Sequence, residues 1–332
     1  MPQGIFNPLK LYDFTPMINI IEPENTTVTS LNLFDVSRHN TTTVLVTRQE
    51  ETTPIMGDRQ RQGERNFVTH TGEIVKPLQI PFFNLDRNIK PVDIQNWRSM
   101  LEADTPRTVE QEVQRFMQRI RNINAKTKEK IFTEALLGRA YAPNSPQMQV
   151  NYYNFWEVTQ HVVTVDMDST TIDPSSVLET EARAYIIDTK GNGTTQTGIW
   201  ALCGRQYFQA MVDNAFVRTA YQFYQQGVNP IRDRLSGNSD ARRFEFRGIT
   251  YIEDIYGNIP TNEAIIFPSG IDGMFQAYYA PADTLADANT VAQEEYMWYT
   301  EDLRTASIQS EFSLLAANTR PELVVRSVMA GE

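Results

Sequence analysis

The chain has 332 residues with 30 Lys+Arg and 41 Asp+Glu, which gives a formal net charge of −11. Hydrophobic residues make up 41% of it and charged residues 21%, which is typical of a folded protein and excludes disordered, collagen-like and coiled-coil chains. The negative charge disfavours binding of nucleic acid through the overall field. No apolar run approaches the roughly 18 residues of a membrane span, and the amino end lacks a basic region before an apolar one, so neither anchoring nor export is expected.

The residues that usually bind metals are scarce. The single cysteine, Cys203, excludes an internal disulfide framework and a cysteine-based zinc site, and His39, His70 and His161 are too scattered to form a ligand pair. Cys203 follows the apolar residues 200–202 and has no histidine nearby, which favours a small buried residue over a nucleophile. We therefore expect no cofactor and no metal site.

The amino-terminal third predicts an arm and a hairpin. Residues 1–35 mix short apolar pieces with Pro, Asn and Thr and show no sustained period, which favours an arm without a core. Residues 41–50 are β-branched and predict a strand, with residues 65–70 as its return. The tip between them, residues 51–64, is almost entirely polar. Because a lone hairpin buries too little surface to offset its ordering entropy, something else must cover it.

The clearest helix begins with Thr105 as N-cap, or with a capping box of Thr108 and Gln111, and Gly138 can end it. One stripe recurs at spacings of three and four, at Val109, Val113, Phe116, Ile120, Ile123, Thr127 and Ile131. About 30 residues at about 1.5 Å each span roughly 45 Å, against a mean helix of about 11 residues. Such a helix must lie along the outside of an extended body, which suggests a plate rather than a ball.

The second half predicts both helices and strands. Residues 151–168 predict hairpin strand, residues 174–189 a helix, and residues 205–226 a further helix that Gly227 and Pro230 stop. Further strands are predicted at residues 244–253, 264–267, 274–279 and 312–325. This order favours an α+β fold over the regular alternation of a doubly wound sheet.

One motif could carry catalysis. Asp166-Met167-Asp168-Ser169-Thr170, after an apolar strand, resembles the nucleophile motif of haloacid-dehalogenase-type phosphatases, in which one carboxylate attacks phosphorus, the other is acid and base, and magnesium neutralises the phosphate. That chemistry also needs a lysine and a second acidic element; Lys190 is present, but no acidic pair follows. A polar strand end and turn is the favoured interpretation, and a magnesium-dependent phosphatase using Asp166 and Asp168 is the alternative function.

Basic residues cluster locally despite the negative net charge. For these clusters, solvated faces or salt bridges to acidic neighbours are favoured over contact with DNA. The clusters are Arg59, Arg61 and Arg65; Arg115, Arg119, Arg121, Lys126, Lys128 and Lys130; and Arg232, Arg234, Arg242 and Arg243.

Short motifs follow one another along nearly the whole chain: Phe14-Thr15-Pro16-Met17-Ile18-Asn19, Leu33-Phe34, Thr41-Thr42-Thr43-Val44-Leu45-Val46, Ile80-Pro81-Phe82, Ala201-Leu202-Cys203-Gly204, Arg243-Phe244-Glu245-Phe246-Arg247-Gly248-Ile249-Thr250-Tyr251, Phe267-Pro268-Ser269-Gly270, Gly273-Met274-Phe275-Gln276, Ala280-Pro281-Ala282-Asp283, Asn289-Thr290 and Thr319-Arg320-Pro321-Glu322. In this order they resemble the major capsid proteins of tailed phages, in the lambda-type E protein family with its Hong Kong 97-like fold. The sequence departs from the family at Ala292, where Gly is usual, and at residues 312–314, where Ser-Asn-Pro is typical. These departures affect local turns.

The resemblance implies a thin, L-shaped α+β subunit with an N-terminal arm, an extended β-hairpin loop, a peripheral domain with a long spine helix, and an axial domain. The implied division is 1–38 for the arm, 39–80 for the extended loop, 81–170 for the peripheral domain with its spine helix at about 108–137, 171–298 for the mainly axial domain, and 299–332 for C-terminal return strands. The arm, hairpin and over-long helix suit this scheme if adjacent copies supply their burial.

The implied function is that of a major capsid protein of a tailed double-stranded DNA phage, which self-assembles into an icosahedral shell and catalyses no reaction. Implied partners are copies of the chain in pentamers and hexamers, scaffold, portal and decoration proteins, and enclosed DNA bound without sequence specificity, with no membrane. The implied location is the virion, and the host cytoplasm during assembly. We expect residues 41–70 to lie over one neighbour and residues 1–35 to reach another. The expected contact residues are Ile55, Met56, Arg59, Arg61 and Arg65, with the arginines paired to carboxylates.

Overall fold

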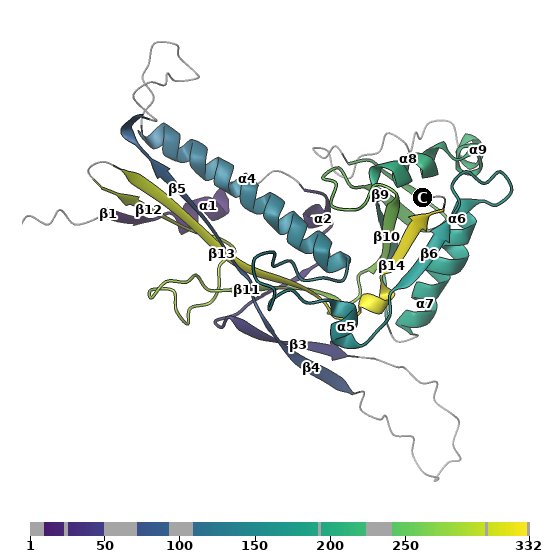
Figure 1. The fold of residues 1–332 in the computed structure, drawn as a ribbon, viewed down its shortest axis with the longest axis horizontal. Helices are drawn as coiled ribbons and strands as arrows, with labels where there is room; N and C mark the ends of the chain where they lie inside the picture. Colours follow the sequence, from purple (N-terminus) through teal and green to yellow (C-terminus); the bar gives the residue numbers. More distant parts are fainter. Residues whose placement is uncertain are drawn as a thin grey trace, which may run out of the picture.

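The computed structural model of the protein describes residues 10–22, 26–49, 72–92, 109–191, 194–223, 241–302 and 305–330. In these residues the strands form two six-stranded sheets and one two-stranded sheet. Figure 1 shows an elongated molecule with one lobe around each large sheet, the long helix α4 along the first lobe, and the two-stranded sheet beside it. The mixed α+β architecture is confirmed, since helices pack on sheets made mainly of antiparallel pairs.

The first lobe is built on a sheet with the strand order β1, β12, β13, β11, β2, in which β5 also pairs with β13. Its strands are β1 (Lys10–Asp13), β2 (Asp35–Arg38), β5 (Phe82–Ile89), β11 (Phe275–Ala280), β12 (Tyr296–Glu301) and β13 (Ala306–Asn318). The short helices α1 (Thr15–Ile20) and α2 (Thr27–Ser30) lie between β1 and β2 in the chain and contact α4. Long β13 therefore organises this lobe, because β5, β11 and β12 all pair with it.

Helix α4 (Val109–Leu136) covers one face of this sheet. Phe116 and Ile120 pack against Tyr299 of β12 and Ile308 of β13. The apolar stripe predicted from the sequence is this buried face, although Ile123 lies exposed. The helix is therefore held by its packing on the sheet rather than by helix propensity alone.

Gly138 ends the helical segment, as predicted. Its φ of 78° lies in the left-handed region that glycine adopts without strain. A Cβ there would lie 2.2 Å from the Tyr153 ring, so the close approach of this ring also requires glycine.

The second lobe has the strand order β6, β14, β10, β7, β9, β8. Its strands are β6 (His161–Val165), β7 (Gly198–Cys203), β8 (Arg243–Phe246), β9 (Ile249–Glu253), β10 (Glu263–Ser269) and β14 (Val325–Met329). Its helical segments are α6 (Pro174–Val177), the π-helical η1 (Leu178–Arg183), α7 (Ala184–Lys190), α8 (Arg205–Asp213) and α9 (Ala215–Phe223). Side chains alternate along each strand, so Ala201 and Ile266 face these helices whereas Leu202 and Ile265 face the first lobe.

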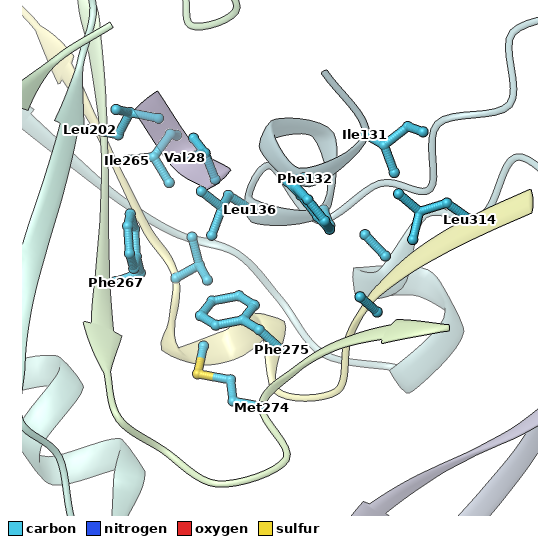
Figure 2. Close-up of a cluster of buried hydrophobic side chains, with 14 of the residues drawn as sticks. Val28, Ile131, Phe132, Leu136, Leu202, Ile265, Phe267, Met274, Phe275 and Leu314 are labelled. Carbon is cyan, nitrogen blue, oxygen red and sulfur yellow. The ribbon is translucent and has the colours of Figure 1, made fainter. Parts of the chain in front are cut away.

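One hydrophobic cluster joins the two lobes, as Figure 2 shows. Ile265 and Phe267 of the second sheet meet Phe132 and Leu136 near the end of α4 and Phe275 of β11. The rings of Phe267 and Phe275 meet edge to face, with centroids 6.1 Å apart. Burial of each such side chain contributes about 1.5–3 kcal/mol, so the lobes share one continuous core.

The two-stranded sheet is the hairpin of β3 (Thr43–Gln49) and β4 (Glu73–Gln79), which pair in antiparallel register. Beside it lie the short helix α5 (Tyr152–Trp156) and the 3₁₀ turn η3 (Pro321–Leu323). The strand predicted at residues 41–50 is confirmed as β3. The return strand is β4, whereas the predicted return at residues 65–70 lies outside the described residues.

The predicted absence of a core in residues 1–35 is wrong for the described part. Ile18 and Val28 are buried, and β1 pairs with β12 of the same chain. The Glu129 carboxylate of α4 accepts hydrogen bonds from the backbone N–H groups of Val28 (2.7 Å) and Thr29 (3.0 Å). Each short apolar piece thus packs separately on α4 and the sheet, which needs no sustained period in the sequence.

Three predicted elements end or pair differently. The helix at residues 205–226 is two helices, because Asn214 breaks it: its Oδ1 accepts from the Phe216 N–H (2.9 Å) and its Nδ2 donates to the Met167 carbonyl (3.1 Å). The strand at residues 312–325 divides at η3 into the end of β13 and the start of β14, in different sheets. Strand β6 pairs in parallel with β14, not in a hairpin.

Candidate assembly surface

The hairpin is fixed to the body by one of its two faces. Val44 and Val46 of β3 and Leu78 of β4 are buried and pack in a cluster that includes Tyr152 and Trp156 of α5. Residues directly opposite in an antiparallel pair share a face, and Val44 lies opposite Leu78. These side chains therefore form an inner face that the chain itself covers, which supplies the burial that a lone hairpin lacks.

Helix α5 is itself held in place by polar contacts. The Tyr152 hydroxyl donates to the Ala316 carbonyl (2.7 Å), and the Trp156 indole N–H donates to the Asn318 carbonyl (3.0 Å), both on β13. Lys76 of β4 donates to the Phe155 carbonyl, and its ammonium lies 5.0 Å from the centre of the Phe155 ring. Complete burial raises the pKa of Tyr152, so its hydroxyl stays a donor at any physiological pH.

A buried ion pair attaches the far end of β3. Arg48 Nη2 lies 3.2 Å from Glu322 Oε1 of η3, and the same carboxylate oxygen lies 3.5 Å from Arg320 Nε. All of these side chains are largely buried, so the attraction is screened little by solvent. The direction in which the hairpin leaves the body is therefore set by charge as well as by packing.

The other hairpin face is open to solvent, and we call it the outer hairpin face. It consists of Thr43, Leu45, Thr47, Val75, Pro77 and Gln79. Leu45 is 65% exposed and Val75 is 47% exposed, and Pro77, opposite Leu45, is also exposed. A strand pair with apolar side chains on both faces is typical of a sheet that is covered on both sides. The outer hairpin face is thus a candidate contact for another molecule.

The structure tests only part of the predicted contact. Ile55, Met56, Arg59, Arg61 and Arg65 lie outside the described residues. They fall in the segment between β3 and β4, so the hairpin leads into them. The outer hairpin face was missed from the sequence. The consecutive apolar residues 44–46 were the pattern that could have indicated it, because a strand covered on one face only would alternate.

Further exposed apolar side chains lie at sheet edges. Leu11 on β1, Val36 on β2 and Val162 on β6 are all exposed, and each strand ends the order of its sheet. An edge strand presents backbone groups that its own sheet does not pair, so it favours contact with another chain. Leu285, in the loop between β11 and β12, is fully exposed. The described surface thus offers several candidate contacts besides the hairpin.

The catalytic candidate has the geometry of a turn. Asp166 follows β6 directly, and its Oδ1 accepts from the Asp168 N–H (3.0 Å), as in a local turn; both aspartates are exposed. Lys190 donates to the Thr194 carbonyl (3.2 Å). Cys203 is fully buried, which raises the pKa of its thiol, as expected of an inert core cysteine.

Two searches of the described part of the chain found nothing. It brings together no group of three His, Cys, Asp or Glu side chains placed to hold a metal ion. Among the same residues, no helix combines the length and the apolar character of a membrane span.

Comparison with known proteins identifies the family. Residues 10–329 match the family described as phage major capsid protein E. The chain belongs to this family. The major capsid protein of Pseudomonas phage KPP10 is 26% identical over 323 residues, which cover 90% of this chain and 91% of that protein.

Solved capsid structures share the fold. The capsid protein resembles the cyanophage Pam1 capsid with a TM-score of 0.54 at 10% identity, covering 93% of this chain and 91% of that one. It resembles the cyanophage P-SCSP1u capsid with a TM-score of 0.53 at 9% identity, covering 94% and 90%. The predicted Hong Kong 97-like fold is confirmed, and the chain is a major capsid protein of a tailed phage and a component of the virion.

Proposed function

We propose that copies of this capsid protein form pentamers and hexamers by laying the hairpin of one subunit over the next. The observation that carries the proposal is the outer hairpin face, in which Leu45 and Val75 lie exposed on a strand pair whose other face is buried. Covering these side chains with an adjacent copy removes apolar surface from water at about 25 cal/mol per Å². In a closed shell this contact repeats around every capsomer, so a modest energy per contact is multiplied.

The proposal extends to the tip of the hairpin and to other partners. Ile55, Met56, Arg59, Arg61 and Arg65 would continue the contact on the neighbour, with the arginines paired to carboxylates. The edge strands β1 and β2 and residues 1–9 offer further contacts between copies. The shell would enclose double-stranded DNA without reading its sequence. Scaffold, portal and decoration proteins would join it during assembly in the host cytoplasm.

Replacing Leu45 with Asp is expected to prevent assembly without unfolding the subunit. The side chain is 65% exposed, so the subunit should keep its melting temperature within about 2 °C, whereas a charge buried between copies without a partner costs several kcal/mol at each contact. Sedimentation velocity and negative-stain microscopy measure the fraction of protein in closed particles. The wild-type chain should give regular particles, tubes or capsomers, and Leu45→Asp should give subunits.

The matched control is Ile123→Asp, which places the same charge at an exposed apolar position on α4, away from the hairpin. This variant should assemble like the wild type. Normal particles from Leu45→Asp would contradict the proposed contact, and equal loss of assembly in both variants would show that any added charge disrupts the shell.

A further inference from the structure

The basic cluster of α4 divides into a buried part and an exposed part. Arg121 and Lys128 are buried and both contact the Glu295 carboxylate, with Lys128 Nζ at 2.7 Å. Arg115, Arg119 and Lys126 lie exposed, and Lys130 is partly exposed, on the side of the helix away from the sheet. Helical spacing alone could not separate these groups, because the carboxylate that neutralises the first lies more than 160 residues away in the chain.

The exposed part forms a continuous line of positive charge, which we call the basic stripe: Arg115, Arg119, Lys126, Lys130 and Arg139. Between Gln111 and Lys130, where every side chain is described, none of the exposed residues is acidic. From Arg115 to Lys130 the stripe covers about 22 Å of helix at about 1.5 Å per residue. A line of this kind is unusual on a chain whose net charge is −11.

The carboxylates near the stripe lie beneath their cations. Glu112, at 3.9 Å from Arg115, is 5% exposed while Arg115 is 56% exposed. Glu134 is 13% exposed and contacts both Lys130 (3.0 Å) and Arg139 (2.9 Å), and Arg139 is 56% exposed. Exposed ion pairs of this kind are weak and exchange partners easily. The surface therefore presents the positive ends of these pairs to an approaching molecule.

The opposite face of the same sheet carries the opposite charge. Ile308 packs under α4, so Gln309 and Glu311, which alternate with it on β13, point away from the helix. Asp86 of β5 lies opposite Gln309 and shares that far face. Burial raises the pKa of Glu311, and the nearby carboxylates of Asp283, Asp86 and Asp287 raise it further, as expected in a concentration of negative charge.

We propose that the basic stripe faces the interior of the shell and contacts the phosphate backbone of the enclosed double-stranded DNA, while the acidic far face of the sheet points outward. The inference rests on the proposed shell. In a lobe made of one helix on one sheet, the two faces become the two surfaces of the shell, and duplex DNA carries one negative charge per about 1.7 Å of its axis. Side chains that contact only phosphates position DNA without reading its sequence, as packaging requires.

The first test measures binding of a duplex to the full chain at different salt concentrations. Arg119→Gln with Lys126→Gln removes two charges of the stripe and leaves Glu112 and Glu134 with their cations. Each lost phosphate contact should reduce the slope of log affinity against log salt by about 0.9, so affinity between about 50 and 200 mM salt should fall about tenfold less than for the wild type. The matched control, Arg205→Gln with Arg218→Gln, alters two exposed arginines of the second lobe and should bind like the wild type.

The second test determines which face is inside. Cys203 is the single cysteine and is fully buried, so an introduced cysteine is the only reactive thiol of a folded subunit. Lys126→Cys should react with a bulky polyethylene glycol maleimide in free subunits and be protected in closed particles. Gln309→Cys, on the far face, should react in both.

The outcomes separate the inference from the proposed shell. Closed particles with an unchanged salt slope in the Arg119 and Lys126 variant, or with Lys126→Cys reactive and Gln309→Cys protected, would overturn the inference and leave the shell intact. Stripe-dependent DNA binding by a chain that forms no particles would support DNA contact and contradict the shell. If the stripe binds polyglutamate but not DNA, its partner is an acidic protein, and the inference is wrong.

Discussion

A chain that lacks residues 51–64 is expected to fold into soluble subunits that form no closed shells. The deletion falls between the end of β3 and the start of β4, so it leaves the buried inner face of Val44, Val46 and Leu78 in place. The stability of the subunit should therefore change by less than about 1 kcal/mol, because shortening a loop changes its closure entropy only slightly. Assembly should be lost, because the segment carries the predicted contacts with the neighbouring subunit.

Negative-stain microscopy and sedimentation velocity give the fraction of deleted chain in particles, and urea unfolding gives its stability. A variant with residues 51–64 replaced by Gly and Ser at the same length separates the effect of the side chains from that of the connection. Closed particles of normal size from the deleted chain would sink the proposed role of the hairpin.

Replacing Glu295 with Gln is expected to lower the free energy of unfolding by about 3–5 kcal/mol. Glu295 is 1% exposed, and it accepts hydrogen bonds from Arg121, from Lys128 Nζ (2.7 Å) and from Asn124 Nδ2 (2.9 Å). A neutral amide of the same size leaves two buried cations without their counter-charge, and breaking a buried ion pair on one side has a cost of this size. The effect should be large because these contacts tie α4 to the chain that enters β12.

The adjacent residue provides a matched control. The Glu294 side chain is 39% exposed and contacts the exposed Arg38 at 3.3 Å, so Glu294→Gln should change the free energy of unfolding by less than about 1 kcal/mol. Urea unfolding followed by circular dichroism compares the two variants. Equal effects in both would show that the buried cluster adds no more to stability than a surface pair.

Much of the local structure is predictable because it depends on residues close in the chain. The buried face of α4 follows from apolar spacing between Val113 and Ile131, and Gly138 marks its end. Strand β3 follows from its β-branched run. The break at Asn214 could not be predicted in this way, because the helical pattern continues through it and the side chain bonds to Met167, far away in the chain.

The functional surface divides in the same manner. By itself the sequence determined the family, through motifs in order along the chain, and the presence of a hairpin that needs covering. Only the tertiary structure decided which hairpin face the subunit covers itself, and that residues 10–22 and 26–35 pack on their own chain. Only the fold decided which cations of α4 are neutralised, since Glu295 reaches Arg121 and Lys128 when β12 is laid beside the helix. The physical reason is that periodicity reports which side chains turn inward, whereas burial and charge pairing depend on partners that the fold brings together from far apart in the chain.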